Sequence, residues 1–350
     1  MAFIRYSNVG IKAVSACVPQ NIEKTVDLAY FMQQEDIDKV LSQIGIEEKR
    51  IAASDVCSSD LCYNAAERLI EDNAIDKNEI DALIFVSQTS DFHQPATAPI
   101  LQCRLGLPKS CLSFDINLAC SGYVYGLSVA YAFASQRGIN RVLLLVGETM
   151  SKIVSRNDKV NTPLFGDAGT ATLVEKGEYG ESLFSLHSDG GGAEVMMIPY
   201  GGFRNQSSTE GFVNVTDEDG SVRNGEQFRM DGLEVFNFGM REEPKDIKGL
   251  MAEAGITVDD IDALIFHQAN HFMTDFFANR LKVSKDKVLY SIRKFGNTSS
   301  ASIPLTIVTA MPSSHLARKK VILSGFGAGL SWGSVLLDME KTNISPIIEL

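Results

Sequence analysis

The chain carries one six-residue segment twice, and this repeat constrains its fold more than any other feature of the sequence. Ile-Asp-Ala-Leu-Ile-Phe occurs at residues 80–85 and again 181 positions later at residues 261–266. A longer apolar segment follows each copy, and its residues Val142 and Val321 are 179 positions apart. Two copies of one pattern at nearly the same spacing indicate an internal duplication, with two sheets packed about a pseudo-twofold axis.

Each copy contains short apolar strands with a helix between them. RVLLLVGE and TATLVEK follow the helical segment of the first copy, and KVILSGFG and GSVLLDME follow that of the second. This order is typical of mostly parallel or mixed sheets covered by helices, so we expect an α/β fold. We divide the chain into residues 1–176 and residues 177–350, with an irregular insertion or lid near residues 188–226 that is rich in Gly, Ser, Asn and Asp.

The composition excludes several classes of protein. The chain of 350 residues is 45% hydrophobic and 22% charged, a globular balance rather than that of a disordered or collagen-like chain. A net charge of -12 argues against nucleic-acid binding, because phosphate affinity requires clustered Lys and Arg. Residues 1–20 lack a signal-peptide layout, and the uncharged run 116–136 contains polar residues that favour a buried core helix over a membrane span. We therefore expect a cytoplasmic protein with no membrane partner.

The six cysteines show neither a disulfide nor a zinc pattern. None forms a CxxC pair or lies at metal-ligand spacing from a histidine, which favours free thiols in a reducing compartment. Cys120 opens an apolar helix directly after the strand segment LSFDIN. Unpaired backbone N–H groups and the positive end of the helix dipole favour the nucleophilic thiolate at such a place. The alternative is a small buried side chain, which is our interpretation of Cys17, Cys57, Cys62, Cys103 and Cys111.

Two polar side chains of the second copy are candidate partners of this cysteine. His267 stands where the strand segment ALIF ends, and Asn297 lies in the loop FGNTSSASIP. With Cys120 they occupy strand ends or strand-to-helix loops at one sheet edge, where α/β proteins bind ligands. His267 could instead be a satisfied strand-end histidine, or a metal ligand with His271 and Asp275, and Asn297 an ordinary turn residue. We predict no metal site.

A glycine-rich segment and a basic segment complete the set of candidates. GFGAG at residues 325–329 is not followed by a βαβ unit, so it does not indicate dinucleotide binding. Its glycines instead allow backbone N–H groups to approach a reacting oxygen. The basic segment is either a solvated helix face or a docking surface for an acidic partner, and it comprises Arg280, Lys282, Lys285, Lys287, Arg293 and Lys294.

Motifs spread over nearly the whole chain resemble the thiolase superfamily and, within it, the ketoacyl-ACP synthase III family. They are FDINLACSGYVYGL, FGDAGTATLVE, MDGLEVFNFGMR, HQAN, FGNTSSASIP and GFGAGLSWGSVLL. The resemblance implies a duplicated, five-layer αβαβα fold and a homodimer with its sites near the interface. It places the Cys-His-Asn triad of the family on Cys120, His267 and Asn297.

The reaction implied by this resemblance is a decarboxylating Claisen condensation in fatty acid initiation or a related specialised pathway. An acyl group passes from acyl-CoA or acyl-ACP to Cys120, and the carbanion of decarboxylated malonyl-ACP then attacks it to give a 3-oxoacyl-ACP. His267 and Asn297 would hold the malonyl carbonyl, and backbone N–H groups of Cys120, Gly327 and Ala328 would form the oxyanion hole. No metal or redox cofactor is implied, because the phosphopantetheine arm belongs to the substrates. The substrate pocket of the family corresponds here to Gln94, Phe165, Gln268, Asn270 and Phe326.

Related families fit the sequence less well. Degradative thiolases have a second cysteine in the C-terminal half, and none occurs here after Cys120. Elongating synthases use Cys-His-His, whereas the third residue here is Asn297. Enzymes similar to chalcone synthase share Cys-His-Asn, but their histidine is not normally followed by Gln-Ala-Asn.

Three positions depart from the pattern of the family. Its WIxxRTGI segment binds the CoA adenine through Trp and Arg, and Lys39 and Gln43 stand at these places here. HQANHF has Phe272 in place of an Arg, and Gln94 rather than an aromatic residue precedes Pro95. We therefore expect a divergent member that uses an acyl-ACP donor or an unusual starter.

Two other functions are compatible with these residues. An acyltransferase would pass the acyl group of Cys120 to an alcohol or amine without decarboxylation. A non-catalytic subunit would support an active paralogue in a heteromeric synthase, but such a subunit has no reason to keep a complete triad.

Overall fold

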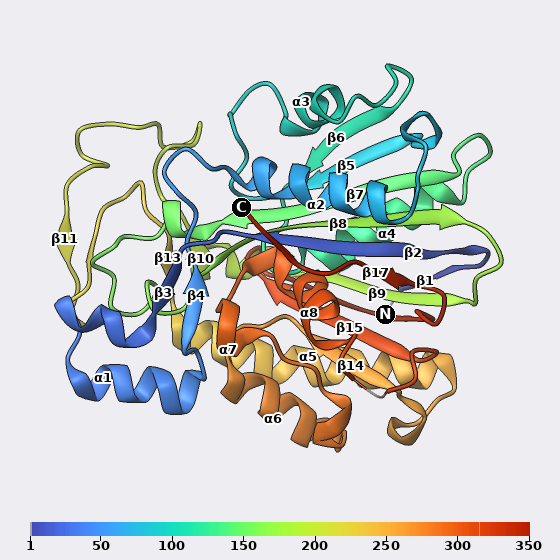
Figure 1. Cartoon of the computed structure of the whole chain (residues 1–350). Coiled ribbons are helices and arrows are strands. Elements are labelled where there is room, and N and C mark those ends of the chain that lie inside the picture. Colours follow the sequence, from blue (N-terminus) through green and yellow to red (C-terminus); the bar gives the residue numbers. More distant parts are fainter. Residues whose placement is uncertain (1, 315) are drawn as a thin grey trace.

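Two mixed β-sheets form the centre of the chain in a computed structural model that describes residues 2–314 and 316–350 (Figure 1). The strands of the seven-stranded sheet are β2 (Val9–Val18), β5 (Ala82–Val86), β6 (Leu112–Ile116), β7 (Arg141–Thr149), β8 (Asp167–Lys176), β17 (Asn343–Ile344) and β18 (Ile348–Glu349). Those of the five-stranded sheet are β1 (Phe3–Tyr6), β9 (Ser182–Ser188), β14 (Ala263–Phe266), β15 (Val321–Gly327) and β16 (Ser331–Leu337).

The two sheets repeat one strand order. The first contains β2-β8-β7-β5 and the second β9-β16-β15-β14. In both, the last two strands of this order pair in parallel, and the other neighbours pair antiparallel. The register also repeats, because Ala82 lies opposite Val142 and Ala263 lies opposite Val321. These pairs belong to the segments whose offset predicted the duplication, and the duplication is confirmed.

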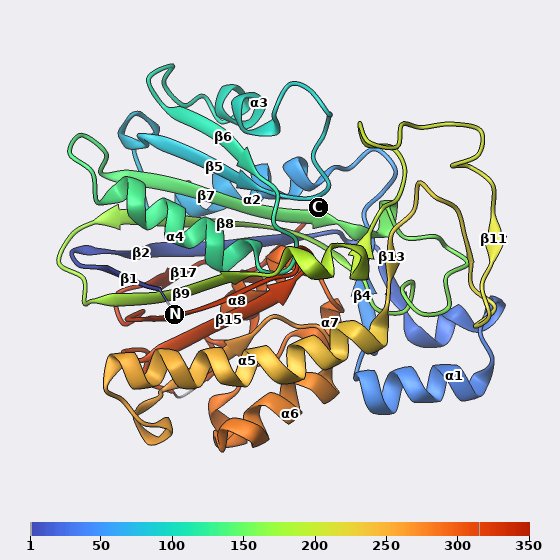
Figure 2. The same cartoon turned by 180° about the vertical axis from the view of Figure 1, so that it is seen from behind.

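Helices form three further layers around and between the sheets (Figure 2). α4 and α8 lie between the sheets, α2 and α3 cover the outer face of the first sheet, and α5 and α6 cover that of the second. The resulting αβαβα arrangement confirms the predicted fold. The helices are α2 (Ser58–Asp72), α3 (Thr97–Arg104), α4 (Gly122–Ala134), α5 (Gly232–Ala254), α6 (His271–Leu281) and α8 (Ser302–Ala310).

The apolar strands are buried on both faces. In β5, Ala82, Ile84 and Val86 pack toward the central helices, while Leu83 and Phe85 pack toward the outer helices. A strand covered on both sides needs apolar residues at every position, which explains its unbroken apolar sequence.

α4 is the uncharged helix that the sequence predicted in the core. Val124, Leu127 and Tyr131 are fully buried between the two sheets. A Cβ atom on Gly126 would lie 2.8 Å from a methyl carbon of Val86, so this glycine allows the helix to pack closely on β5. Within the described residues, every helix is too short or too polar to span a membrane.

The short remaining elements gather at one end of the molecule (Figure 1). They are β3 (Ile22–Lys24), α1 (Gln34–Lys39), β4 (Glu48–Arg50), β10 (Met196–Met197), β11 (Val215–Thr216), β12 (Val222–Arg223), β13 (Arg229–Met230) and α7 (Ile292–Phe295). Between β9 and α5, the regular structure consists only of two-residue strands and a short 3-10 helix.

Terminal strands cross between the two sheets. β1 pairs with β9 of the second sheet, whereas β17 and β18 pair with β2 of the first. The residue at which the two copies divide, predicted near residue 176, stays a prediction.

Candidate active site

Three turns from different parts of the chain meet between the sheets. Cys120 lies on the turn from β6 to α4, His267 directly follows β14, and Asn297 follows α7. β6 and β14 belong to different sheets, so the prediction of a site at one sheet edge was wrong. The duplicated sheets pack through their central helices, which brings the start of α4 against the second copy.

Glycines of β15 allow this close approach. A Cβ atom on Gly327 would lie 2.8 Å from both the backbone nitrogen and the Cβ of Cys120, and one on Gly325 would lie 3.0 Å from the Cys120 carbonyl oxygen. Real Cβ atoms essentially never come within 3.0 Å of other atoms, so the position of Gly327 requires glycine, and a side chain at Gly325 would require the Cys120 carbonyl to shift. β15 continues into the antiparallel strand β16 rather than into a helix, as expected for a segment that does not bind dinucleotides.

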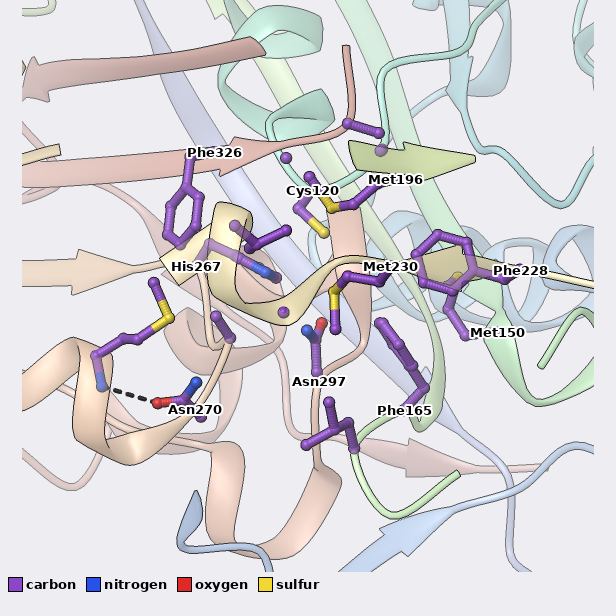
Figure 3. A pocket seen from close by; sticks show the side chains of 18 of the residues that line it. Cys120, Met150, Phe165, Met196, Phe228, Met230, His267, Asn270, Asn297 and Phe326 are labelled. Carbon is purple, nitrogen blue, oxygen red and sulfur yellow. Dashed lines mark hydrogen bonds between the residues drawn. The ribbon is translucent and has the colours of Figure 1, made fainter. Parts of the chain in front are cut away.

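A single cavity joins the three candidate side chains. It has a volume of about 190 Å³, and Cys120, His267 and Asn297 all line it. Figure 3 shows their side chains converging on one space. The rest of the wall is mostly apolar and includes Met150, Phe165, Met196, Phe228, Met230, Val235 and Phe326.

The cysteine is a neutral thiol in the resting site. Burial raises the pKa of Cys120 to about 12, and a hydrogen bond with Ser299 opposes the rise. The thiolate expected from the position at a helix start is therefore not the resting form, because the cost of burying the charge exceeds the stabilisation from the helix. The proton must leave as the sulfur attacks.

The histidine and the asparagine present neutral groups to the cavity. His267 Nδ1 lies 2.7 Å from the Ser302 hydroxyl, and burial lowers the pKa of the imidazole to about 3. The Asn297 side-chain oxygen accepts a hydrogen bond of 2.8 Å from the Ser299 N–H, which directs its NH2 group to the cavity. Two neutral N–H donors can stabilise a developing negative charge without taking up the proton of the thiol.

Sequence comparisons identify the family to which this site belongs. Residues 114–193 match the sequence profile of 3-oxoacyl-[acyl-carrier-protein (ACP)] synthase III, and residues 251–339 match that of its C-terminal part. A beta-ketoacyl-[acyl-carrier-protein] synthase III from Desulfitobacterium hafniense is 34% identical over 341 residues, 96% of this chain and 99% of the relative. The chain belongs to the 3-oxoacyl-ACP synthase III family.

Solved structures agree with this assignment. A 3-oxoacyl-(acyl-carrier protein) synthase from Burkholderia xenovorans superposes with a TM-score of 0.92 at 36% identity, over 100% of this chain and 99% of that one. A synthase III from Thermus thermophilus gives a TM-score of 0.82 at 32% identity, over 94% and 98%. The protein is thus a ketoacyl synthase, an acyltransferase that condenses an acyl group with malonyl-ACP in the initiation of fatty acid synthesis.

Several other residues predicted for the pocket or the oxyanion hole lie at the cavity. Phe165, Asn270 and Phe326 line the cavity, as do Gly327 and Ala328. Asn270 also caps α6, since its side-chain oxygen accepts from the Met273 N–H at 2.8 Å (Figure 3).

Two predicted pocket residues do not line the cavity of their own chain. Gln268 is buried away from it, where its side chain bonds the backbone of Phe266, Ser291 and Ile292. This corrects the prediction, because these hydrogen bonds hold the amide among backbone groups and away from the cavity. Gln94 is exposed on a loop, and its part in a substrate pocket stays a prediction.

The two histidines of HQANH have different surroundings. His267 is buried, whereas the exposed ring of His271 stacks on Tyr290 at 5.0 Å and lies 3.8 Å from Asp275. Among the described residues, no group of three or more His, Cys, Asp or Glu side chains could hold a metal ion.

Much of the basic segment is already paired. Lys285 bonds Asp275 at 2.9 Å, and Arg293 bonds Glu47 at 2.6 Å. Lys287 donates to the Asp259 carbonyl at 3.0 Å. These pairs leave less positive charge for a partner than the sequence alone indicated. Arg280 lines a groove with three basic residues of α5, namely Arg241, Lys245 and Lys248, although Glu242 pairs with Arg241 at 2.6 Å and with Lys245 at 3.3 Å.

Sequence reasoning missed several residues of the site. Gln88, Met150 and Met196 come from segments without a family motif, and apolar residues in a sequence do not reveal whether they face a core or a cavity. Ser299 lies in the same loop as Asn297, two residues further along the chain. Its signal was the repeat offset, because Ser299 is 179 positions from Cys120, as Val321 is from Val142.

Proposed function

We propose that Cys120 is the acyl-accepting nucleophile of this synthase and that His267 and Asn297 activate the malonyl group. The observation that carries the proposal is the shared cavity, in which one thiol and two neutral N–H donors meet. Backbone N–H groups of Cys120 and of the Gly327–Ala328 segment would stabilise the tetrahedral oxyanion.

The two half-reactions use the same groups in succession. The Cys120 sulfur attacks the donor thioester, and its proton ends on the sulfur of the departing thiol. Malonyl-ACP then enters, and His267 and Asn297 donate hydrogen bonds to its thioester oxygen while CO2 leaves. The resulting enolate attacks the acyl carbonyl on Cys120, and the 3-oxoacyl-ACP departs with regeneration of the free thiol.

The cavity wall favours an apolar acyl group. Met150, Met196 and Met230 face the cavity beside Phe165 and Phe228 (Figure 3). An unbranched methionine side chain can change rotamer to fit differing chains, and none of these side chains offers a strong hydrogen-bonding partner to a polar acyl group.

The surroundings of the cavity favour a carrier-bound donor over a CoA donor. Lys39 is already 3.3 Å from Glu35 and 3.6 Å from Asp36. Phe272 stacks on Phe236, a residue of the cavity wall, at a ring separation of 6.0 Å. An aromatic pair cannot neutralise the phosphates of CoA as an arginine would.

A basic surface would then receive the carrier protein. The predicted residues Arg280, Lys282 and Lys294 are exposed, and Arg280 shares its groove with the basic side chains of α5. Acidic carrier surfaces would associate there through complementary charge. The homodimer implied by the family stays a prediction, as does the cytoplasmic location.

Acyl loading tests the proposal directly. The intact mass of the protein would be measured after incubation with a panel of acyl-CoAs and acyl-ACPs, with Cys120→Ala as the control. We expect a gain of one acyl group from acyl-ACP that is absent from the variant.

Three outcomes would revise this view. Loading from acyl-CoA at equal rates would remove the preference for a carrier-bound donor. No loading from any donor, together with activity restored by a paralogous subunit, would support the non-catalytic alternative. Loading followed by transfer to an alcohol or amine without loss of CO2 from malonyl-ACP would support the acyltransferase alternative.

A further inference from the structure

Ser299 contacts two residues of the proposed triad. Its hydroxyl lies 3.4 Å from the Cys120 sulfur, and its N–H donates to the Asn297 side chain at 2.8 Å. The side chain of Ser299 is fully buried.

The direction of the hydrogen bond to sulfur follows from the second partner of the hydroxyl. Gln88 Nε2 lies 2.8 Å from the Ser299 oxygen. An amide NH2 can only donate, so the serine oxygen accepts from Gln88. The single hydroxyl hydrogen of Ser299 is then available for the Cys120 sulfur.

The buried carboxyl group of Glu148 supports this arrangement through hydrogen bonds to its neighbours. Glu148 accepts hydrogen bonds from the Ser300 hydroxyl at 2.7 Å and from the Thr89 hydroxyl at 3.0 Å. It also accepts from the Gln88 N–H at 3.2 Å. Glu148 therefore links Gln88, which bonds the Ser299 hydroxyl, with Ser300, the residue after Ser299. This network holds Ser299 at a φ of 50°, which few residues other than glycine adopt.

We infer that Ser299 is a further catalytic residue, whose hydroxyl donates a hydrogen bond to the Cys120 sulfur and stabilises its anionic form during attack on the donor. Gln88 and Glu148 are positioning residues that act through Ser299. The inference rests on the proposed role of Cys120 as nucleophile.

The chemistry of the site explains why such a donor is needed. Burial disfavours the thiolate, and the charge of Glu148 also raises the pKa of Cys120, whereas the bond from Ser299 lowers it. The neutral His267 supplies no compensating positive charge. A hydrogen bond to the charged form is the remaining way for a side chain to stabilise it.

The duplication gives independent support. The repeat offset of 179 to 181 residues makes the turn at Ser299 the second-copy counterpart of the turn at Cys120. Ala119 and Ser299 both have positive φ, at 23° and 50°, and each lies three residues before the first residue of its helix, Gly122 or Ser302. Two equivalent turns thus face each other, one carrying the nucleophile and the other its donor.

Ser299→Gly is the variant that removes only the hydroxyl function. Glycine adopts a φ of 50° without strain, and it keeps the backbone N–H that bonds Asn297. The measurement is the rate of Cys120 alkylation by iodoacetamide as a function of pH, followed by peptide mass. We expect the titration of the thiol to move to higher pH and alkylation at neutral pH to slow about tenfold.

Controls separate this role from general damage. Ser313→Gly replaces an exposed serine that does not line the cavity and should leave the alkylation profile unchanged. Malonyl-ACP decarboxylation in a Cys120→Gln background, a step without the sulfur, tests whether Ser299→Gly also displaces the Asn297 side chain that the Ser299 N–H holds. Gln88→Leu leaves the turn itself intact and should move the thiol titration in the same direction by a smaller amount.

The outcomes are distinguishable. An unchanged alkylation profile in both Ser299→Gly and Gln88→Leu would overturn the inference while leaving Cys120 as nucleophile. Loss of decarboxylation in the Ser299→Gly background variant would show that the residue merely shapes the turn. Failure of the unsubstituted protein to load any acyl group would instead overturn the proposed function.

Discussion

At the scale of single residues, burial sets the protonation states of the site. It raises the pKa of Cys120 and lowers that of His267, so that both are neutral near pH 7. A neutral imidazole can donate a hydrogen bond to a substrate oxygen, but it cannot serve as a charged partner for a thiolate. The stabilisation of the attacking sulfur must therefore come from other groups.

The low pKa of His267 predicts a flat pH profile for the decarboxylation step. With the pKa lowered to about 3, the imidazole stays neutral at every pH above about 5. Malonyl-ACP decarboxylation by Cys120→Gln should then vary little between pH 5 and pH 8. An inflection near pH 6.5, the ordinary imidazole value, would contradict the burial argument. His267→Ala in the same background is the control and should lose about 10²-fold in rate.

At the scale of elements, β15 determines where the nucleophile lies. The strand reaches Cys120 through Gly325 and Gly327, which have no side chains to hold the two segments apart. The same approach places the N–H groups of Cys120 and of the segment after β15 at one wall of the cavity.

A methyl group on β15 should therefore impair acyl loading. In Gly327→Ala, the new Cβ would lie 2.8 Å from the nitrogen of Cys120, and the turn would have to move. We expect loading of Cys120 to slow about 10²-fold, since small displacements of a reacting group have large effects on rate. Gly190→Ala is a matched control, because an added Cβ there meets no atom within 4 Å. Equal loading rates for the two variants would show that the close approach is unimportant.

At the scale of the whole molecule, the second copy buries a carboxyl group that does not line the cavity. Glu243 of α5 is fully buried against the second sheet, where it accepts a hydrogen bond of 2.6 Å from Ser324. Burial and the neighbouring Asp246 raise its pKa to about 8. The native state thus keeps a proton that the unfolded chain, with an ordinary pKa of 4.5, releases.

This group predicts how the stability of the protein depends on pH. Its contribution is complete below pH 4.5 and is lost as pH rises toward 8, because only the native state binds the proton in this range. The free energy of unfolding should fall by up to about 1.4 kcal/mol per pH unit from this cause. Glu243→Gln should remove that slope between pH 5 and pH 8 in denaturant titrations. An identical slope in both proteins would show that Glu243 is ionised in the folded state.

Prediction from sequence succeeded where the signal was local or repeated. The offset between residues 80–85 and residues 261–266 identified equivalent strands, because apolar segments of a duplicated sheet keep the same pattern. Prediction failed for Gln268, whose position in a family motif gave no sign that its amide bonds the backbone of a distant segment.

The sequence by itself determined the duplication, the α/β fold and the family, because spacing, strand pattern and motifs are properties of the linear chain. Only the tertiary structure decided that Cys120 and Ser299 face each other between the two sheets and that both Cys120 and His267 are neutral. The physical reason is that burial and hydrogen bonding at one atom depend on residues more than a hundred positions away, and no local pattern records their sum.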